Sequence, residues 1–286
     1  MTQSVPVNLG PVQETLLIPL LGRARETVKK RGLLGDPKAV EIVDRLAYDF
    51  SKWERSRSLV GTCVRTCMFD AYVRRFLAEN PDGTIVELGC GLNTRFERLD
   101  NGRAYWIEVD LSDVVALRRR FFDEGPRRTL IAASALDTSW MDAAEARRAP
   151  VMVVAEAILI YLDAPDARKA IETIAARFPG VWIAFDSTSS RMVDSQANHD
   201  AMRHLPRESW FRWRCDDPRE IQSWANGLRL AESRTFLDAD PTLVSRFPWM
   251  FRWMVRYAPW SLRHRIGDYR LNLCIADTSE DTPVEN

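Results

Sequence analysis

Residues 84–110 set the architecture of this chain. They contain a short apolar run, a turn with two glycines, and a second apolar run that ends on an aspartate. Gly89 and Gly91 lack the Cβ atom that would keep a ligand away from the end of a strand. Asp110 lies nineteen residues after Gly91, where a strand–turn–helix–strand unit places the carboxylate that binds ribose hydroxyls. The segment therefore predicts a nucleotide site at the edge of a parallel α/β sheet.

The residues around the turn narrow the choice of nucleotide. A dinucleotide turn needs a third glycine and a free helix N-terminus for the pyrophosphate, but this chain has Thr94 at the third position. Glu87 adds a negative charge that disfavours a pyrophosphate and is compatible with a cationic ligand. No Tyr-x-x-x-Lys pair follows residues 151–155, which also disfavours a nicotinamide oxidoreductase. On these residues alone, the alternative that the glycine turn belongs to an unrelated doubly wound domain stays open.

The rest of the chain alternates between strand and helix patterns. Beyond the two strands already described, apolar runs predict strands at residues 129–133, 151–155, 181–186, 228–236 and 269–276. One-sided apolar spacing predicts helices at residues 14–30, 37–50, 62–80, 111–122, 167–178 and 218–226, and an amphipathic helix within 248–254. Strands separated by helices favour a parallel sheet. We therefore expect an α/β fold with a doubly wound, mostly parallel, seven-stranded sheet.

This pattern predicts one domain over residues 1–286. Residues 1–80 precede the first strand and form a helical cap, either a lid or a fixed layer over the sheet. Residues 81–186 form the nucleotide-binding core. Residues 187–286 hold the last strands and an insertion at 187–217, which follows the fifth strand and should overhang the carboxyl ends of the strands, where ligands bind.

Composition excludes several classes of protein. Forty basic residues balance forty acidic ones, so the chain lacks the positive field of a protein that binds nucleic acid. The longest apolar stretch, residues 151–162, is too short to span a membrane and contains Glu156. Residues 1–10 lack the features of a secretory signal, so we expect a cytoplasmic protein without a membrane partner. The five cysteines show no zinc-site spacing, and we expect reduced thiols and no metal.

The chain contains an ordered set of motifs: Arg65-Thr66, residues 86–95, residues 108–111, Leu136-Asp137 with Trp140, and residues 155–162. Together they resemble the leucine carboxyl methyltransferase family, most closely its bacterial branch of polyketide O-methyltransferases. The resemblance covers most of residues 12–280. It departs from the branch at Asn93, where Asp is common, and at Cys90, where Ala is common.

The resemblance implies a class I, Rossmann-like methyltransferase fold and S-adenosylmethionine (SAM) as cofactor. Arg65 would bind the methionyl carboxylate, a task suited to a planar guanidinium. Glu156 would meet the ammonium group, because a carboxylate that ends so apolar a strand is costly without a cation or donor. The full set of implied cofactor contacts is Arg65, Glu87, Gly89, Gly91, Asn93, Asp110, Leu111, Ser134, Ala135 and Glu156.

The resemblance points to an acceptor oxygen on a small aromatic or polyketide-like natural product. A carboxylate, with a pKa near ~4, is ionised at neutral pH, whereas a phenol, near ~10, needs a base. His199, His204 and Tyr161 are the candidate catalytic residues, and Tyr161, Arg191 and Arg203 are the candidate substrate contacts. A DNA amino-methyltransferase is disfavoured, because residues 156–159 lack the two prolines and the aromatic residue of that class.

Two other functions stay open at this stage, namely methylation of a protein or peptide carboxylate and non-catalytic SAM binding. The sequence leaves the oligomeric state open.

Overall fold

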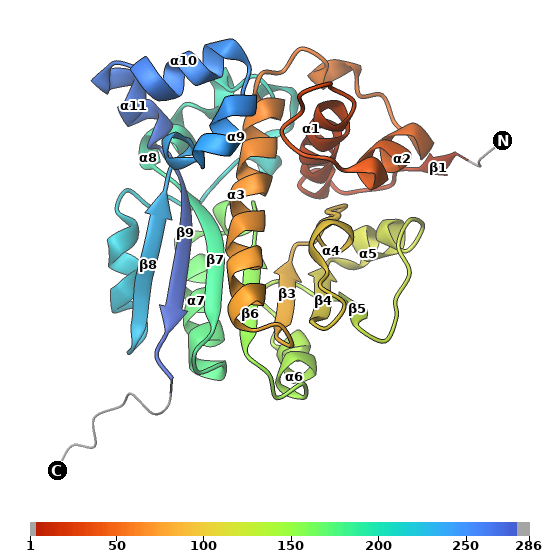
Figure 1. The fold of residues 1–286 in the computed structure, drawn as a ribbon, viewed down its shortest axis with the longest axis vertical. Coiled ribbons are helices and arrows are strands. Elements are labelled where there is room, and N and C mark those ends of the chain that lie inside the picture. Colours follow the sequence, from red (N-terminus) through yellow and green to blue (C-terminus); the bar gives the residue numbers. More distant parts are fainter. Residues whose placement is uncertain (1–3, 279–286) are drawn as a thin grey trace.

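The computed structural model describes residues 4–278, and a seven-stranded sheet runs through its centre (Figure 1). Across the sheet the strands are β5 (Arg128–Ala132), β4 (Tyr105–Asp110), β3 (Thr84–Leu88), β6 (Val151–Ala155), β7 (Trp182–Thr188), β9 (Tyr269–Ala276) and β8 (Leu228–Arg234). The first five are parallel, and β9 is antiparallel to both of its neighbours. The predicted fold class is therefore confirmed.

The strand order reverses between β3 and β6, because the chain builds β3, β4 and β5 in one direction and then returns to add β6 and β7 on the other side. Such a switch point opens a crevice at the carboxyl ends of the two central strands. The glycine turn follows β3, and Glu156 follows β6. The topology alone thus brings these two segments to the same place.

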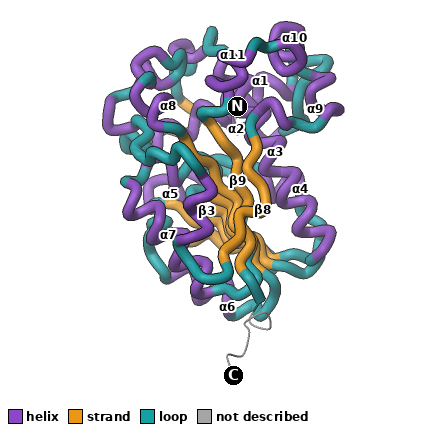
Figure 2. The backbone as a smooth tube through the Cα atoms, turned by 90° about the vertical axis from the view of Figure 1, so that its left-hand side faces the viewer, coloured by secondary structure: helices purple, strands orange, loops and turns teal. Residues whose placement is uncertain are grey.

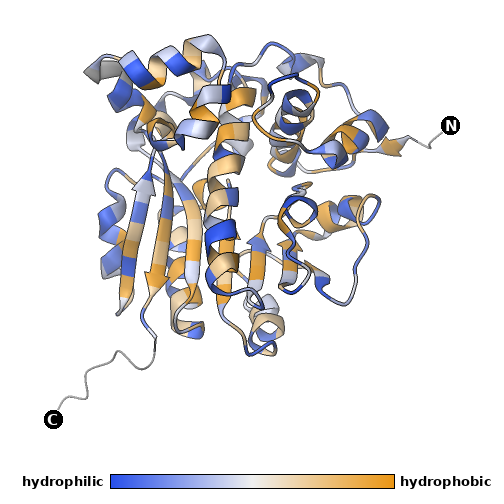
Figure 3. Ribbon diagram, viewed as in Figure 1, coloured by the Kyte–Doolittle hydropathy of each residue, from blue (hydrophilic) through white to orange (hydrophobic). Residues whose placement is uncertain are grey.

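Helices cover both faces of the sheet. The cluster on one face includes residues of α3 (Ser58–Glu79), α4 (Arg95–Leu99) and α5 (Ser112–Arg118). The cluster on the other face includes residues of α6 (Ser139–Glu145) and α7 (Ala164–Arg177). The strands are largely hydrophobic (Figure 3), as expected for a sheet buried on both sides.

A further group of helices lies at the carboxyl end of the sheet (Figures 1 and 2). It comprises α1 (Leu17–Thr27), α2 (Pro37–Arg45), α8 (Ser190–Asp194), α9 (Pro241–Arg246), α10 (Trp249–Tyr257) and α11 (Trp260–Ile266). The predicted helix at residues 37–50 ends early, because Leu46 adopts an extended backbone and pairs with Val5 in a small parallel sheet of β1 (Val5–Pro6) and β2 (Leu46–Ala47).

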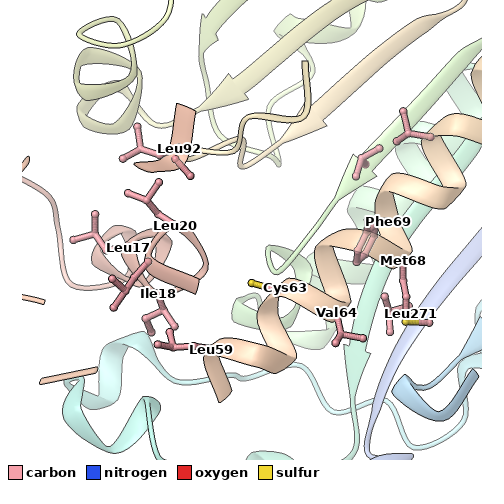
Figure 4. Close-up of a cluster of buried hydrophobic side chains, with 14 of the residues drawn as sticks. Leu17, Ile18, Leu20, Leu59, Cys63, Val64, Met68, Phe69, Leu92 and Leu271 are labelled. Atoms are coloured by element: carbon pink, nitrogen blue, oxygen red, sulfur yellow. The ribbon is translucent and has the colours of Figure 1, made fainter. Parts of the chain in front are cut away.

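The N-terminal helices are packed firmly onto the nucleotide segment. Leu17 and Leu20 of α1 share a hydrophobic cluster with Leu59 of α3 and with Leu92, which directly follows the glycine turn (Figure 4). The buried Arg23 donates a hydrogen bond of 2.8 Å to the carbonyl oxygen of Leu92. Of the two arrangements considered for residues 1–80, this packing favours the fixed layer.

Residues 4–278 contain neither a membrane-spanning helix nor a cluster of metal ligands. No helix in this range is long and apolar enough to cross a bilayer. The same range contains no cluster of three or more His, Cys, Asp or Glu side chains that could hold a metal ion.

Candidate functional site

A cavity of about 900 Å³ opens at the switch point between β3 and β6. Its walls come from the N-terminal segment, α3, the ends of four parallel strands, and the insertion after β7. All the residues predicted to contact a cofactor line it: Arg65, Glu87, Gly89, Gly91, Asn93, Asp110, Leu111, Ser134, Ala135 and Glu156. Residues up to 91 positions apart in the sequence thus meet in one place.

The turn after β3 requires its glycines. Gly89 and Gly91 have φ angles of 63° and 49°, in the left-handed region that side chains disfavour. A Cβ atom on Gly89 would lie 1.8 Å from Cδ1 of Ile158. The backbone of this turn therefore approaches the end of β6 more closely than any other residue type would permit.

Asp110 ends β4 beside this turn. Its Oδ2 accepts a hydrogen bond of 2.7 Å from the Gly91 N–H, and its Oδ1 accepts one of 2.8 Å from the Leu111 N–H. Burial raises the pKa of this carboxyl, and the two N–H groups oppose the rise. A carboxylate has about four lone-pair positions, so each oxygen can accept a further hydrogen bond from a ligand hydroxyl.

An arginine that the sequence analysis missed holds the turn from behind. Arg118 of α5 is fully buried, and its Nη1 donates to the carbonyl oxygens of Gly91 and Asn93 at 2.9 and 2.7 Å. Its Nε donates to the buried Glu108 at 3.0 Å. The available signal was Glu108 itself, a carboxylate in the middle of an apolar strand, which requires a cation on the face where it points.

A second missed arginine links the acidic residues beneath the cavity. Arg95 of α4 donates to Asp70 at 2.8 Å, to Glu156 at 2.5 Å and to Glu87. All of these side chains are almost completely buried. The Oε2 atom of Glu87 is buried without a hydrogen-bond partner among the described residues. Glu87 lines the cavity, which makes this oxygen a candidate acceptor for a ligand donor.

Glu156 has more partners than the sequence suggested. Its Oε1 accepts hydrogen bonds of 2.9 Å from Arg65 Nε and from Thr66 Oγ1. Burial opposes its charged form, but Arg65 and Arg95 lower the pKa of Glu156 to about 2. The sequence argument required a cation or a donor at this carboxylate, and the protein itself supplies two arginines and the Thr66 hydroxyl. A contact between Glu156 and the ammonium group of the cofactor stays a prediction.

Arg65 also joins a cluster beyond β6. Its Nη1 donates to the Tyr269 hydroxyl at 3.2 Å, and that hydroxyl donates to Asp186. Asp186 accepts from the Ala157 N–H at 3.0 and 2.9 Å, which holds Ala157 at a φ of 57°. Burial raises the pKa of Asp186 to about 6, although Arg65 opposes the rise. The cluster fixes the backbone that follows Glu156.

The far wall of the cavity is apolar and aromatic. Tyr161 and Phe211 pack edge to face with their ring centroids 5.4 Å apart. Phe236 stacks on Tyr269 at 5.5 Å. The other apolar side chains on this wall include Met192, Met202 and Phe251. A flat, largely apolar molecule fits such a wall.

His199 lines the cavity, as the sequence analysis expected of a candidate base, but its hydrogen bonds do not suit that role. Its Nδ1 accepts from the N–H groups of Ala201 and Met202, each at 3.3 Å. In the neutral ring the proton is then on Nε2, which becomes a donor. Burial lowers the pKa of His199, opposed by Asp200, which favours the neutral ring. The neutral ring presents no free lone pair, because Nδ1 already accepts from two N–H groups.

Three residues predicted for the acceptor end, the substrate contacts Arg191 and Arg203 and the candidate base His204, are not among the residues that line the cavity, so the structure does not support those predictions. Arg191 donates to Asp268 at 2.7 Å and to the His264 carbonyl oxygen at 2.8 Å, because α8 turns it outward. Arg203 and His204 are exposed and contact each other at 3.2 Å. None of the three lines the cavity, whereas Tyr161 does.

Arg57, which the sequence analysis missed, lines the cavity instead. It immediately precedes α3, whose cavity-lining residues recur as Arg57, Gly61 and Arg65. A spacing of four keeps them on one helix face, and eight residues separate the two arginines by about 12 Å. Arg57 thus lies further along the wall that contains Arg65, and it is exposed, whereas the other arginines that line the cavity are buried: Arg23, Arg65 and Arg95.

Comparisons with known proteins agree with this arrangement. The sequence profile of the leucine carboxyl methyltransferase family matches residues 17–175. The tetracenomycin polyketide synthesis O-methyltransferase TcmP of Streptomyces glaucescens is 32% identical over 244 residues, which cover 85% of this chain and 89% of that protein. The S-adenosyl-L-methionine-dependent methyltransferase dpfgK of Gibberella zeae is 31% identical over 91% of this chain and 94% of its own.

Among solved structures, a DUF574-family protein of Streptomyces avermitilis shares the fold with a TM-score of 0.58 at 15% identity, covering 90% of this chain and 97% of that one. The profile covers more than half of this chain, and the identity to TcmP extends over most of both proteins. The chain therefore belongs to the leucine carboxyl methyltransferase family and is a methyltransferase that uses S-adenosylmethionine.

Proposed function

We propose that this methyltransferase methylates an oxygen of a small aromatic or polyketide-like acceptor, with a carboxylate as the favoured group. The observation that carries the proposal is the continuity of the cavity, which runs from the glycine turn and Asp110 to the aromatic wall at Tyr161 and Phe211. One space thus has a polar end suited to the cofactor and an apolar end suited to a flat acceptor. The relation to TcmP supports an acceptor of this class.

The cavity residues match the parts of SAM. Asp110 would bind the ribose hydroxyls through the free lone pairs of its two oxygens. Arg65 would bind the methionyl carboxylate, while the unpartnered Oε2 of Glu87, together with Glu156, would face the ammonium group. Leu111, Ser134 and Ala135 would contact the adenine. Asn93 would contribute to the turn, held there by the bond from Arg118 to its carbonyl oxygen.

Bound SAM supplies a methyl group on a cationic sulfur, open to displacement by an acceptor oxygen in line with the carbon–sulfur bond. The protein contributes mainly by positioning, which can supply much of such an acceleration. Tyr161 and Phe211 would orient the acceptor, and Arg57 would pair with its carboxylate. His199 would donate from Nε2 rather than accept a proton, so the site favours an acceptor that is already ionised.

The alternatives differ in what they require of this cavity. A protein or peptide terminus would need an extended groove with backbone partners, and the aromatic wall offers few such partners. A non-catalytic SAM-binding protein would not need space for an acceptor beside the cofactor. We further propose that residues 1–286 act as one domain, with residues 1–80 as the cap over the cofactor.

The pH dependence of turnover tests the nature of the acceptor. A carboxylate acceptor should give a rate that is flat from about pH 6 upward, because the group is ionised throughout. Initial rates with labelled SAM and a panel of aromatic acids and phenols would provide the profile. Release of the new methyl group by mild base would identify an ester. A rate that rises through pH 7 to 9, with a base-stable product, would contradict the carboxylate and favour a phenol.

Arg57→Gln should raise the KM for a carboxylate acceptor about tenfold and leave kcat within about twofold, because a partly exposed charge-assisted bond contributes modestly to binding. Arg55→Gln is the matched control, since Arg55 is exposed like Arg57 but does not line the cavity. Steady-state kinetics at saturating SAM measures both values. An unchanged KM for Arg57→Gln would remove Arg57 from the acceptor site.

A further inference from the structure

A second surface of the molecule has no part in the methyl-transfer site. It is the outer face of α10 with the neighbouring arginines of α9 and α11, and we call it the aromatic–arginine face. We propose that this face docks onto the surface of an anionic phospholipid bilayer. Such a contact needs no membrane-spanning segment, so it is compatible with the absence of one from residues 4–278.

The two sides of α10 differ in what they contact. Phe251 and Val255 point inward and pack against the hydrophobic core. Trp249, Trp253 and Tyr257 recur every four residues, and they are 75%, 51% and 61% exposed. Three large aromatic residues in one exposed stripe are unusual for a surface that faces only water. Trp and Tyr are the residues that favour the headgroup region of a membrane.

The charges around this stripe are all of one sign. Residues 241–267 contain five arginines and no aspartate or glutamate, although the whole chain has no net charge. These arginines are exposed, and within residues 4–278 none of them forms a salt bridge. They are Arg246, Arg252, Arg256, Arg263 and Arg265. Figure 3 shows hydrophobic and hydrophilic residues interleaved along α10, a pattern typical of helices that lie in a membrane interface.

Charge complementarity selects a lipid surface over a second copy of this chain. In a symmetric dimer the same patch meets itself, so the arginines would face arginines with no acidic residue on the patch to pair with them. An anionic bilayer instead offers a negative charge for each guanidinium, while the aromatic rings enter the headgroup layer. An acidic protein would satisfy the charges, but it would have no need of three exposed aromatic rings in a row.

The aromatic–arginine face lies close to the acceptor end of the cavity. The group of helices that contains α10 lies at the carboxyl end of the sheet (Figures 1 and 2), and Phe251, on the inner side of α10, lines the cavity. One helix therefore separates the docking surface from the apolar wall of the cavity. Membrane docking would place the cavity next to a phase in which apolar molecules concentrate, whichever acceptor the enzyme uses.

Co-sedimentation with vesicles tests the proposal. The full chain should bind vesicles that contain phosphatidylglycerol and should not bind vesicles of phosphatidylcholine alone. Raising the ionic strength from about 0.1 M to about 1 M should release it, because the Debye length falls from about 10 Å to about 3 Å. Equal binding to both kinds of vesicle, or binding to neither, would overturn the proposal.

Variants locate the contact. The double variant Arg252→Gln/Arg256→Gln should weaken partitioning into anionic vesicles about thirtyfold, at about fivefold for each arginine. The double variant Trp249→Ala/Trp253→Ala should weaken it about tenfold. Arg119→Gln with Arg120→Gln, at the end of α5, is the control of equal charge change and should bind like the parent. Calorimetric SAM binding should be unchanged in every variant, which confirms folding. Parental binding by both α10 variants would exclude this face.

Two further outcomes would also reject the lipid proposal. If the parent forms concentration-dependent dimers that the α10 variants abolish, and ignores anionic vesicles, the face is an interface between copies. If the parent binds an acidic protein through the same arginines but no vesicle, the partner is a protein.

Discussion

Arg95→Met should lower the free energy of unfolding by about 3–5 kcal/mol, the usual cost of removing one partner from a buried ion cluster. Methionine keeps most of the side-chain volume but leaves Asp70, Glu87 and Glu156 without their shared cation. Urea unfolding of both proteins would measure the difference. Arg119→Met, at an exposed arginine that follows α5, is the control and should change stability by less than about 0.5 kcal/mol.

The pH dependence distinguishes this cause from a general packing defect. In the parent, the pKa of Glu156 is lowered to about 2, so its ion pairs stabilise the fold above the unfolded pKa near 4.5 and are lost as the pH falls toward 2. In Arg95→Met the same burial should raise the pKa values of these carboxyls, most of all that of Glu87, because Asp70 keeps Arg98 and Glu156 keeps Arg65. They then take up protons at mildly acidic pH. The stability deficit should therefore be smaller at pH 5 than at pH 8. A deficit equal at both values would indicate lost packing instead.

Asp110→Ala should weaken SAM binding about ten- to a hundredfold, since charge-assisted hydrogen bonds of this kind contribute about 1.5–3 kcal/mol. Each Asp110 oxygen accepts one backbone N–H and retains room for a ligand hydroxyl. Isothermal calorimetry with SAM, and with NAD as a ligand that should not bind, measures the effect. Asp113→Ala, three residues further along the chain and outside the cavity lining, provides the matched control.

The SAM affinity of the variant Arg65→Ala has to be interpreted together with that of Asp110→Ala. Arg65 is held between Glu156 at 2.9 Å and Asp186 at 3.9 Å, so its removal disturbs two buried carboxylates and should lower stability as well as affinity. If Asp110→Ala and Asp113→Ala both bind SAM like the parent, Asp110 has no role in holding the ribose.

The cofactor end of the site could be predicted from the sequence because it depends on local features and on one topological rule. Gly89, Gly91, Asp110 and Glu156 each lie within three residues of the end of a parallel strand. In a parallel sheet such ends share one edge, whatever the side chains elsewhere do. The strand runs themselves are nearly continuous in apolar residues, so the sheet, and with it the meeting of these four residues, followed from the pattern.

The acceptor end depended on tertiary structure. Residues 187–217 lack a periodic pattern, so nothing in the sequence distinguished His199, which lines the cavity, from Arg191 and Arg203, which do not. Arg57 and Tyr269 come from opposite ends of the chain and meet the cavity only through the packing of α3 and β9.

Which cations pair with the buried carboxylates was also decided by the tertiary structure. A glutamate inside an apolar strand indicates that a cation must lie nearby, but it does not indicate which residue supplies that cation. Arg95 and Arg118 occupy that role because α4 and α5 pack on the face of the sheet to which Glu87 and Glu108 point. Period and composition determine which residues of a strand are buried, whereas the partner of a buried charge is chosen by the three-dimensional approach of another element, because an ion pair forms only within a few ångströms.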